Sequence, residues 1–244
     1  MESEKVTEKI PLEFTIDAMD KANVRKGMIC AWWGPQGRLI SNEEVAEAVN
    51  RYPDRFVGIA SVNLYKNQWK QSGRSGSLSV NMALKDCELS SGTGTFRPQI
   101  DGIIPCLPNV STLISPSVSR WVIRVRCVLP NPAGRIPHID EIAIDFPELK
   151  VVCGHVGYPW TNRNDRCCDK HKNVFIDTSA YTAKRFPPEL VAFMKENGKK
   201  KVLFGSNYPM LFPAKCMEKL EDLQLEEDGT ELFLFRNAER IFGL

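Results

Sequence analysis

Three apolar segments near the end of the chain each finish in a short polar group, and this recurrence constrains the fold more than any other feature. Gly154-His155 follows LKVVC, Asp177-Thr178-Ser179 follows VFI, and Ser206-Asn207-Tyr208 follows KVLFG. A helix-length stretch follows each segment, so the chain returns before it starts a parallel neighbour. Because the carboxyl ends of parallel strands open on one side, the polar groups are expected to meet at one edge of a sheet.

The rest of the chain alternates between extended and helical patterns. Ser41, with Glu44 three residues later, predicts a capping box at the start of a helix that stops before Pro53. Pro187 and Pro188 predict the start of another helix, which ends at Gly198. Further helices are expected over residues 13–24 and 136–146. The expected parallel strands are residues 26–33, 56–63, 149–154, 174–178 and 201–205.

The strand-end motifs carry a resemblance to a known family. CGHVGYPW, NVFIDTSAY, KVLFGSNYPM and the closing NAERIFGL resemble the amidohydrolase-related branch of the amidohydrolase superfamily. This branch contains metal-dependent TIM-barrel hydrolases and decarboxylases such as aminocarboxymuconate-semialdehyde decarboxylase. The resemblance includes residues 17–20, 33–35 and 39–65, fails from about Lys66, and resumes at Ile136.

The resemblance implies an α/β fold, a TIM (β/α)8 barrel formed by one domain over residues 1–244. A barrel of this kind typically needs about 250 residues, so the length is a tight fit. Counted against the family, the five expected strands are the second, third, sixth, seventh and eighth. The barrel is therefore expected to be incomplete, with its first strand missing.

Residues 67–134 have no sustained period of 2 or 3.6, which is unusual inside a compact domain. Their content of Ile, Leu, Val and Trp is also high for a disordered insertion. If the codons of residues 81–90 are read one base upstream, allowed codon choices spell (H/Y)GFKGLRIV, which resembles the family at this point. The hypothesis is that residues 67–134 are read out of frame, so that strands four and five are scrambled and this stretch is largely irregular.

A second, shorter window behaves in the same way. Read one base downstream, residues 163–169 can spell EMIAVAT, which would complete an amphipathic helix after the sixth strand. Cys167 and Cys168 would then be accidents of frame. Of the eight cysteines, five lie in the two windows, and nothing indicates export. The cysteines therefore indicate neither a disulfide framework nor a zinc cluster.

The family's metal ligands are mostly missing from this chain. The family binds a divalent metal, zinc above all, through a His-x-His pair after the first strand, a His after the fifth and an Asp after the eighth. The chain has three histidines and no His-x-His, and Asn207 stands where the family has the Asp. An amide is a much poorer ligand for a hard cation than a carboxylate. Bound metal is therefore not expected in this chain.

Each candidate site residue has a structural alternative. His155, between small residues at a strand end, is expected to be catalytic, although it could be a satisfied structural group. Asp177 is a second catalytic candidate that could instead fix its loop. Asn207, at the family's metal position, could likewise only fix a loop by hydrogen bonds. The candidate substrate-binding residues are Tyr158, Trp160 and Tyr208, which could also be core aromatics.

Composition excludes several classes of partner. The formal net charge is +2, which is too weak to indicate nucleic acid or an anionic membrane surface. No apolar run approaches the roughly 18 residues of a spanning helix, and MESEKVTEKI is too charged for a signal peptide. The expectation is a cytoplasmic protein with a small-molecule substrate, no nucleic acid and no membrane. A homo-oligomeric state is left open.

Two functional classes remain open from the sequence. The resemblance implies a metal-dependent hydrolase or decarboxylase, a carbon-carbon lyase, that acts on a small carboxylated or cyclic metabolite. The alternative is a catalytically inactive, frame-damaged fragment with no enzymatic role.

Overall fold

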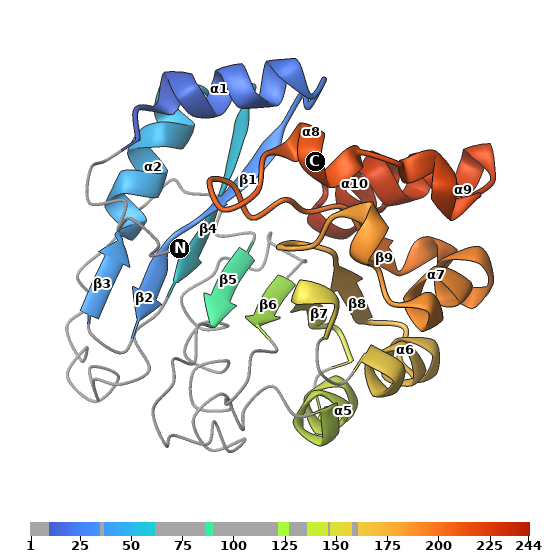
Figure 1. The fold of residues 1–244 in the computed structure, drawn as a ribbon. Helices are drawn as coiled ribbons and strands as arrows, with labels where there is room; N and C mark the ends of the chain where they lie inside the picture. The colour runs from blue at the N-terminus through green and yellow to red at the C-terminus, as the bar shows by residue number, and fades with distance from the viewer. Residues whose placement is uncertain are drawn as a thin grey trace, which may run out of the picture.

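Seven parallel strands form one sheet in the order β1-β4-β5-β6-β7-β8-β9, and β2 pairs with β3 in a small antiparallel ribbon (Figure 1). The structure, a computed structural model, describes residues 10–34, 37–61, 86–89, 122–126, 136–145, 147–157 and 161–244. The strands are β1 (Gly27–Cys30), β2 (Trp32–Gly34), β3 (Gly37–Ile40), β4 (Phe56–Ser61), β5 (Asp86–Leu89), β6 (Val122–Arg126), β7 (Lys150–Gly154), β8 (Val174–Asp177) and β9 (Val202–Leu203).

The helices follow the strands in the β/α order that the sequence predicted. The α-helices are α1 (Leu12–Lys21), α2 (Asn42–Arg51), α5 (Ile136–Asp145), α6 (Thr161–Lys170), α7 (Pro188–Lys195), α8 (Pro213–Met217), α9 (Glu227–Glu231) and α10 (Asn237–Phe242). Short 3-10 turns are η3 (His155–Gly157), η4 (Ala183–Arg185), η5 (Asn197–Lys200) and η6 (Leu220–Leu223), and η7 (Leu232–Arg236) is a π-helical turn. Among the described residues, no helix is long and apolar enough to span a bilayer.

The predicted helix starts are confirmed in their local chemistry. Glu44 N donates to Ser41 Oγ over 3.0 Å, and Ser41 N donates to Glu44 Oε2 over 2.8 Å, which completes the capping box of α2. Pro188 is the first residue of α7, where its fixed φ suits the helix and its missing N–H is not needed. The five predicted strands appear as β1, β4, β7, β8 and β9, and every pairing among the seven is parallel.

The stretch from 67 to 134 differs from expectation at two places. β5 pairs with β4 through Ala60 and Cys87, and β6 pairs with β7 over its whole length, from Val122 opposite Lys150 to Arg126 opposite Gly154. The prediction that the fourth and fifth strands are lost from the sheet is therefore wrong. Residues such as Cys87-Glu88 and Arg124 fit no apolar strand pattern. β5 and β6 nevertheless lie between β4 and β7, where each can form backbone hydrogen bonds with a strand on both sides. Backbone pairing of this kind requires no particular side chain. Among the described residues, no pairing joins β9 back to β1.

Two apolar clusters lie on the two faces of the sheet, because successive strand residues point to opposite sides. Val151, Cys153, Val174, Ile176 and Val202 face the helices α5, α6 and α7, which lie beside β7 to β9 in Figure 1. The intervening residues Val152, Phe175 and Leu203 meet Ile59 from β4, and Ile241 and Phe242 from α10. The strand ends that carry the candidate site are thus anchored on both faces.

Candidate active site

The ends of β7, β8 and β9 bring the candidate polar residues to one edge of the sheet. Strand pairing places Cys153 opposite Ile176, and Asp177 opposite Leu203. His155 directly follows β7, Asp177 is the last residue of β8, and Asn207 lies in the loop after β9. These three residues therefore stand at the carboxyl edge, where barrel enzymes carry their catalytic groups.

His155 begins a turn whose backbone is left-handed. The φ angle is 56° at His155, 53° at Val156 and 71° at Gly157. This conformation is unfavourable for a β-branched residue and costs on the order of 1 to 3 kcal/mol. Val156 is fully buried in the apolar cluster beneath the outer helices. Core packing of Val156 therefore holds the turn that displays His155.

One hydrogen bond fixes the tautomer of His155. Its Nδ1 lies 3.2 Å from the carbonyl oxygen of Ser179. A carbonyl oxygen can only accept, so Nδ1 is the donor and carries the proton of the neutral ring. Nε2 is then the nitrogen that gains or loses a proton when the ring changes charge.

Asp177 is buried and forms hydrogen bonds with Ser179, the residue whose carbonyl binds His155. Its Oδ1 accepts a hydrogen bond from the Ser179 backbone N–H over 2.9 Å and a second from the Ser179 hydroxyl. An Asp carboxylate that accepts a hydrogen bond from the backbone N–H two residues later in the chain stabilises a turn. Asp177 thus holds Ser179 in the position from which the Ser179 carbonyl binds His155.

The loop after β9 closes against Ser179 as well. A Cβ atom on Gly205 would lie 3.1 Å from both Cβ and N of Ser179, so only glycine allows this close approach without displacement. Ala180 N donates to Ser206 O over 3.4 Å. The polar groups that follow β7, β8 and β9 therefore meet around one residue, Ser179.

Asn207 and Tyr208 form the outer part of this loop. Asn207 has a φ of 62°, a left-handed conformation that Asn tolerates better than most residues. Its Nδ2 lies 3.6 Å from Sδ of Met210, and Met210 N donates to Asn207 O over 3.0 Å. The half-buried Tyr208 ring packs edge-on against Phe212 at 5.3 Å between centroids. The other two candidate substrate-binding residues, Tyr158 and Trp160, lie outside the described residues.

The described residues of this edge do not fit a catalytic divalent metal. Such a site normally needs three protein ligands. Here one imidazole, His155, is joined by Asp177, whose Oδ1 already accepts two hydrogen bonds, and by the neutral amide of Asn207. In the ranges that the structure describes, one group of three His, Cys, Asp or Glu residues has its ligand atoms within 4.8 Å of one another, and it lies elsewhere.

That group can hold a metal ion and consists of Asp140, Cys167 and His171. His171 Nε2 lies 2.6 Å from Asp140 Oδ1, and Lys170 Nζ donates to both oxygens of Asp140 over 2.8 and 3.1 Å. These hydrogen bonds, from Lys170 first and then from His171, lower the pKa of Asp140. Oxygen, sulfur and nitrogen donors suit zinc. His171 precedes β8, so this group lies at the amino edge of the sheet, opposite His155.

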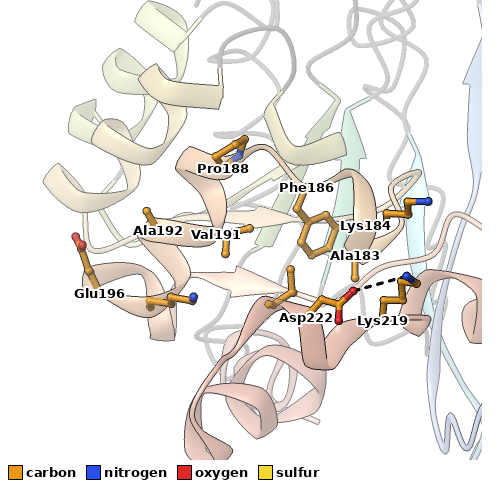
Figure 2. Close-up of a pocket in the computed structure, with 11 residues that line it drawn as sticks. Ala183, Lys184, Phe186, Pro188, Val191, Ala192, Glu196, Lys219 and Asp222 are labelled. Carbon is orange, nitrogen blue, oxygen red and sulfur yellow. Dashed lines mark ion pairs between the residues drawn. The ribbon is translucent and has the colours of Figure 1, made fainter.

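A hollow of about 550 Å³ lies between η4, α7 and η6 (Figure 2). Its wall includes Phe186 and Val191, and Asp222 and Lys219 form an ion pair at 4.0 Å on its border. In Figure 2, Lys184 and Lys219 lie on the side of Phe186 that faces away from Val191. His155, Asp177 and Asn207 do not line this hollow, so it is separate from the strand-end residues.

Ser179 is the site residue that sequence reasoning undervalued. The sequence marks it only as part of the polar group after the seventh strand, yet it contacts the loops of all three strands. Its carbonyl and its amide make two of these contacts, and both are backbone groups, which the residue type does not reveal. The only sequence signal was its place in Asp177-Thr178-Ser179, directly after a buried strand.

The chain is similar to known proteins in part of its sequence and in its fold. Residues 129–244 match the family model described as Amidohydrolase. No curated protein matches the sequence.

Solved structures share the fold over nearly the whole chain. An uncharacterized TIM-barrel protein from Bordetella bronchiseptica has a TM-score of 0.80 and 20% identity, with 96% of this chain and 83% of that chain covered. A 5-carboxyvanillate decarboxylase from Novosphingobium aromaticivorans, with bound manganese, has a TM-score of 0.70 and 16% identity, with 95% and 81% covered. The 2,6-dihydroxybenzoate decarboxylase from Rhizobium has a TM-score of 0.66 and 14% identity, with 99% and 88% covered.

The described strands thus follow the fold of TIM-barrel proteins, and the sequence match covers β7 to β9 together with the helices that flank them. The predicted resemblance to amidohydrolases is thereby confirmed over residues 129–244, and two of the proteins that share the fold are decarboxylases.

Proposed function

We propose that this chain is an amidohydrolase-related carbon-carbon lyase that decarboxylates a small cyclic carboxylate. One observation carries the proposal: His155 stands at the carboxyl edge of a parallel sheet with its Nδ1 bound to the Ser179 carbonyl. That bond leaves proton exchange to Nε2, as an acid or base at a barrel edge requires. The decarboxylases among the similar structures support the choice of reaction.

The proposed step needs one proton donor and a fixed geometry. The His155 imidazolium gives the Nε2 proton to the ring carbon that bears the carboxylate. The bond from that carbon to the carboxylate then breaks, its electron pair returns to the ring, and carbon dioxide leaves. The neutral imidazole regains a proton from water. Asp177 acts through Ser179 as a positioning residue, because its hydrogen bonds hold the carbonyl that orients His155.

The aromatic residues Tyr158, Trp160 and Tyr208 are proposed to contact the substrate ring, and Asn207 is proposed to supply a hydrogen-bonding group. Zinc, which the resemblance implies, does not fit the described residues of this edge, and the proposed step uses no metal. We expect no zinc to remain there after dialysis. Zinc that is retained stoichiometrically and lost on His155→Ala would contradict this, whereas zinc lost on His171→Ala would belong to the group with Asp140.

The test is carbon dioxide release from 2,6-dihydroxybenzoate and from 5-carboxyvanillate, with two histidine variants compared. His155→Gln should lower the rate by about 100-fold or more, the usual contribution of general acid-base catalysis. His171→Gln, a matched change at the opposite edge, should keep the rate. Equal rates for His155→Gln and the unaltered chain would contradict the proposed role.

A second candidate function, no catalysis at all, is favoured by helix α6. Asp165 is 8% exposed, and its Oδ1 has no hydrogen-bond partner among the described residues. The alternative reading EMIAVAT places Ile at position 165, Val at the buried position 167 and Ala at the buried position 168. The exposed positions 166 and 169 receive Ala and Thr. We infer that residues 163–169 are an out-of-frame reading, and the damaged chain is then an inactive product.

Nucleotide sequencing across codons 66, 135, 163 and 169 tests this second candidate. Single-base insertions or deletions near the window edges would support it, and a chain with the restored reading should then release carbon dioxide where this chain does not. An intact frame in high-quality reads, together with activity of this chain, would contradict it.

A further inference from the structure

A second hollow, of about 680 Å³, lies between the segment after β8 and the segment after β9. Four basic residues line it, together with a single carboxylate, Glu218. The basic residues are Lys184, Arg185, Lys215 and Lys219. We call this hollow the basic groove. Its residues lie in the part of the chain outside both windows with an alternative reading.

The positive charge of the basic groove is only partly compensated. Lys215 Nζ lies 2.8 Å from Glu218 Oε2, and Lys219 Nζ lies 4.0 Å from Asp222 Oδ2. Lys184 and Arg185 are exposed on η4, and neither forms an ion pair with another described residue. Two adjacent cations without a described counter-charge favour an anion in the groove.

The basic groove borders the candidate active site on two sides. Ala180, which lines the groove, directly follows Ser179, the residue whose carbonyl binds His155. Met210, which also lines the groove, is hydrogen-bonded to Asn207 through its backbone N–H at 3.0 Å. An anion bound between η4 and α8 would therefore lie next to both strand-end loops.

We propose that Lys184 and Arg185 bind a carboxylate of the substrate and so determine specificity for anionic ligands. The guanidinium of Arg185 offers a planar pair of N–H donors that matches a carboxylate, and Lys184 adds a second charge-assisted donor. This inference rests on the proposed function, since it names what holds the substrate while His155 acts on it.

The test measures binding to the full chain, so it does not depend on turnover. The probes are 2,6-dihydroxybenzoate and resorcinol, the same ring without the carboxylate, titrated by calorimetry. The groove variant is Lys184→Met with Arg185→Met. The control is Lys172→Met with Lys200→Met, which removes the same charge from exposed residues that precede β8 and β9 at the opposite edge. All four side chains are exposed, so both variants should keep the melting temperature of the unaltered chain.

The groove variant should bind 2,6-dihydroxybenzoate at least about tenfold more weakly, a modest loss for two charge-assisted contacts. The control variant should bind 2,6-dihydroxybenzoate as tightly as the unaltered chain does. The affinity for resorcinol should be the same in both variants and in the unaltered chain. An equal loss in groove variant and control, unchanged affinity in the groove variant, or no saturable binding by the unaltered chain would overturn the proposal. Selective loss of binding without any carbon dioxide release by the unaltered chain would support the groove while contradicting decarboxylation. Decarboxylation with an unchanged KM in the groove variant would contradict the groove alone.

Discussion

Helix α6 and strand β8 follow one another in the chain and share one apolar cluster, yet their residues suit burial to different degrees. In β8, Val174, Phe175 and Ile176 are at most 3% exposed, and all three are apolar. In α6 the buried face includes Asp165, with Cys167 and Cys168 beside it. The backbone of α6 thus packs against the sheet as the other helices do, and the two cysteines suit burial, while the Asp165 carboxylate does not match its environment. A segment can therefore occupy its place in a fold even when one of its buried residues is unsuited to that place.

The largest effect on stability is expected when a buried carboxylate, such as Asp165 in α6, is introduced into β8. Ile176→Asp would place a carboxylate at a position that is 0% exposed and sits between two paired strands. Such a group has no partner, and the loss should exceed about 4 kcal/mol in the free energy of unfolding. Denaturant unfolding followed by circular dichroism measures it. A loss below about 1 kcal/mol would mean that the cluster tolerates carboxylates generally, and α6 would then be unexceptional.

The reverse change in α6 should stabilise the protein. Asp165→Ile removes a buried carboxylate whose Oδ1 has no hydrogen-bond partner among the described residues, and it adds apolar surface. The free energy of unfolding at pH 8 should therefore rise by about 2 to 4 kcal/mol. Asp165→Asn is the matched control, because it removes the charge and keeps an unsatisfied polar group. It should gain less. If Asp165→Ile is less stable than the unaltered chain, Asp165 has a partner that favours it.

The pH dependence of that gain has a defined direction. Burial, and then the nearby Glu189 carboxylate, raises the pKa of Asp165 to about 7. In the unfolded chain the pKa of this carboxyl is about 3.9. The folded chain therefore binds the proton more tightly, and the contribution of Asp165 to stability falls as pH rises from about 4 to about 7 and stays low above that range. The advantage of Asp165→Ile should accordingly grow over this interval, by an amount on the order of 2 to 4 kcal/mol. A constant difference from pH 4 to 8, measured by urea titration, would be inconsistent with an unpaired buried carboxylate.

The smallest effect is expected from the two cysteines of α6. Cys167→Val and Cys168→Ala follow the alternative reading and keep small apolar groups at positions 4% and 0% exposed. Changes of this kind usually alter stability by less than about 1.5 kcal/mol. Thermal unfolding of the double variant is the measurement. A loss above about 3 kcal/mol would show that the thiols themselves are required.

The sequence predicted the elements whose local pattern and surroundings agree. Val174-Phe175-Ile176 and the capping box of Ser41 appear as expected, because apolar burial and capping act within a few residues. β5 and β6 could not be predicted, because they are fixed by backbone pairing with neighbours far away in the chain. The positions of His155, Asp177 and Asn207 at one edge followed from parallel topology. Their common contact, Ser179, did not, because a backbone carbonyl leaves no mark in the pattern of side chains.

Hydrogen exchange at a ring carbon tests whether His155 Nε2 transfers a proton to that carbon. Resorcinol in deuterated water should exchange the hydrogen between its two hydroxyls faster when the chain is present, because the same Nε2 would protonate the same carbon. His155→Gln should abolish the acceleration, and His171→Gln should retain it. Nuclear magnetic resonance follows the loss of the ring proton signal. No acceleration by the unaltered chain, or equal acceleration by His155→Gln, would contradict the claim.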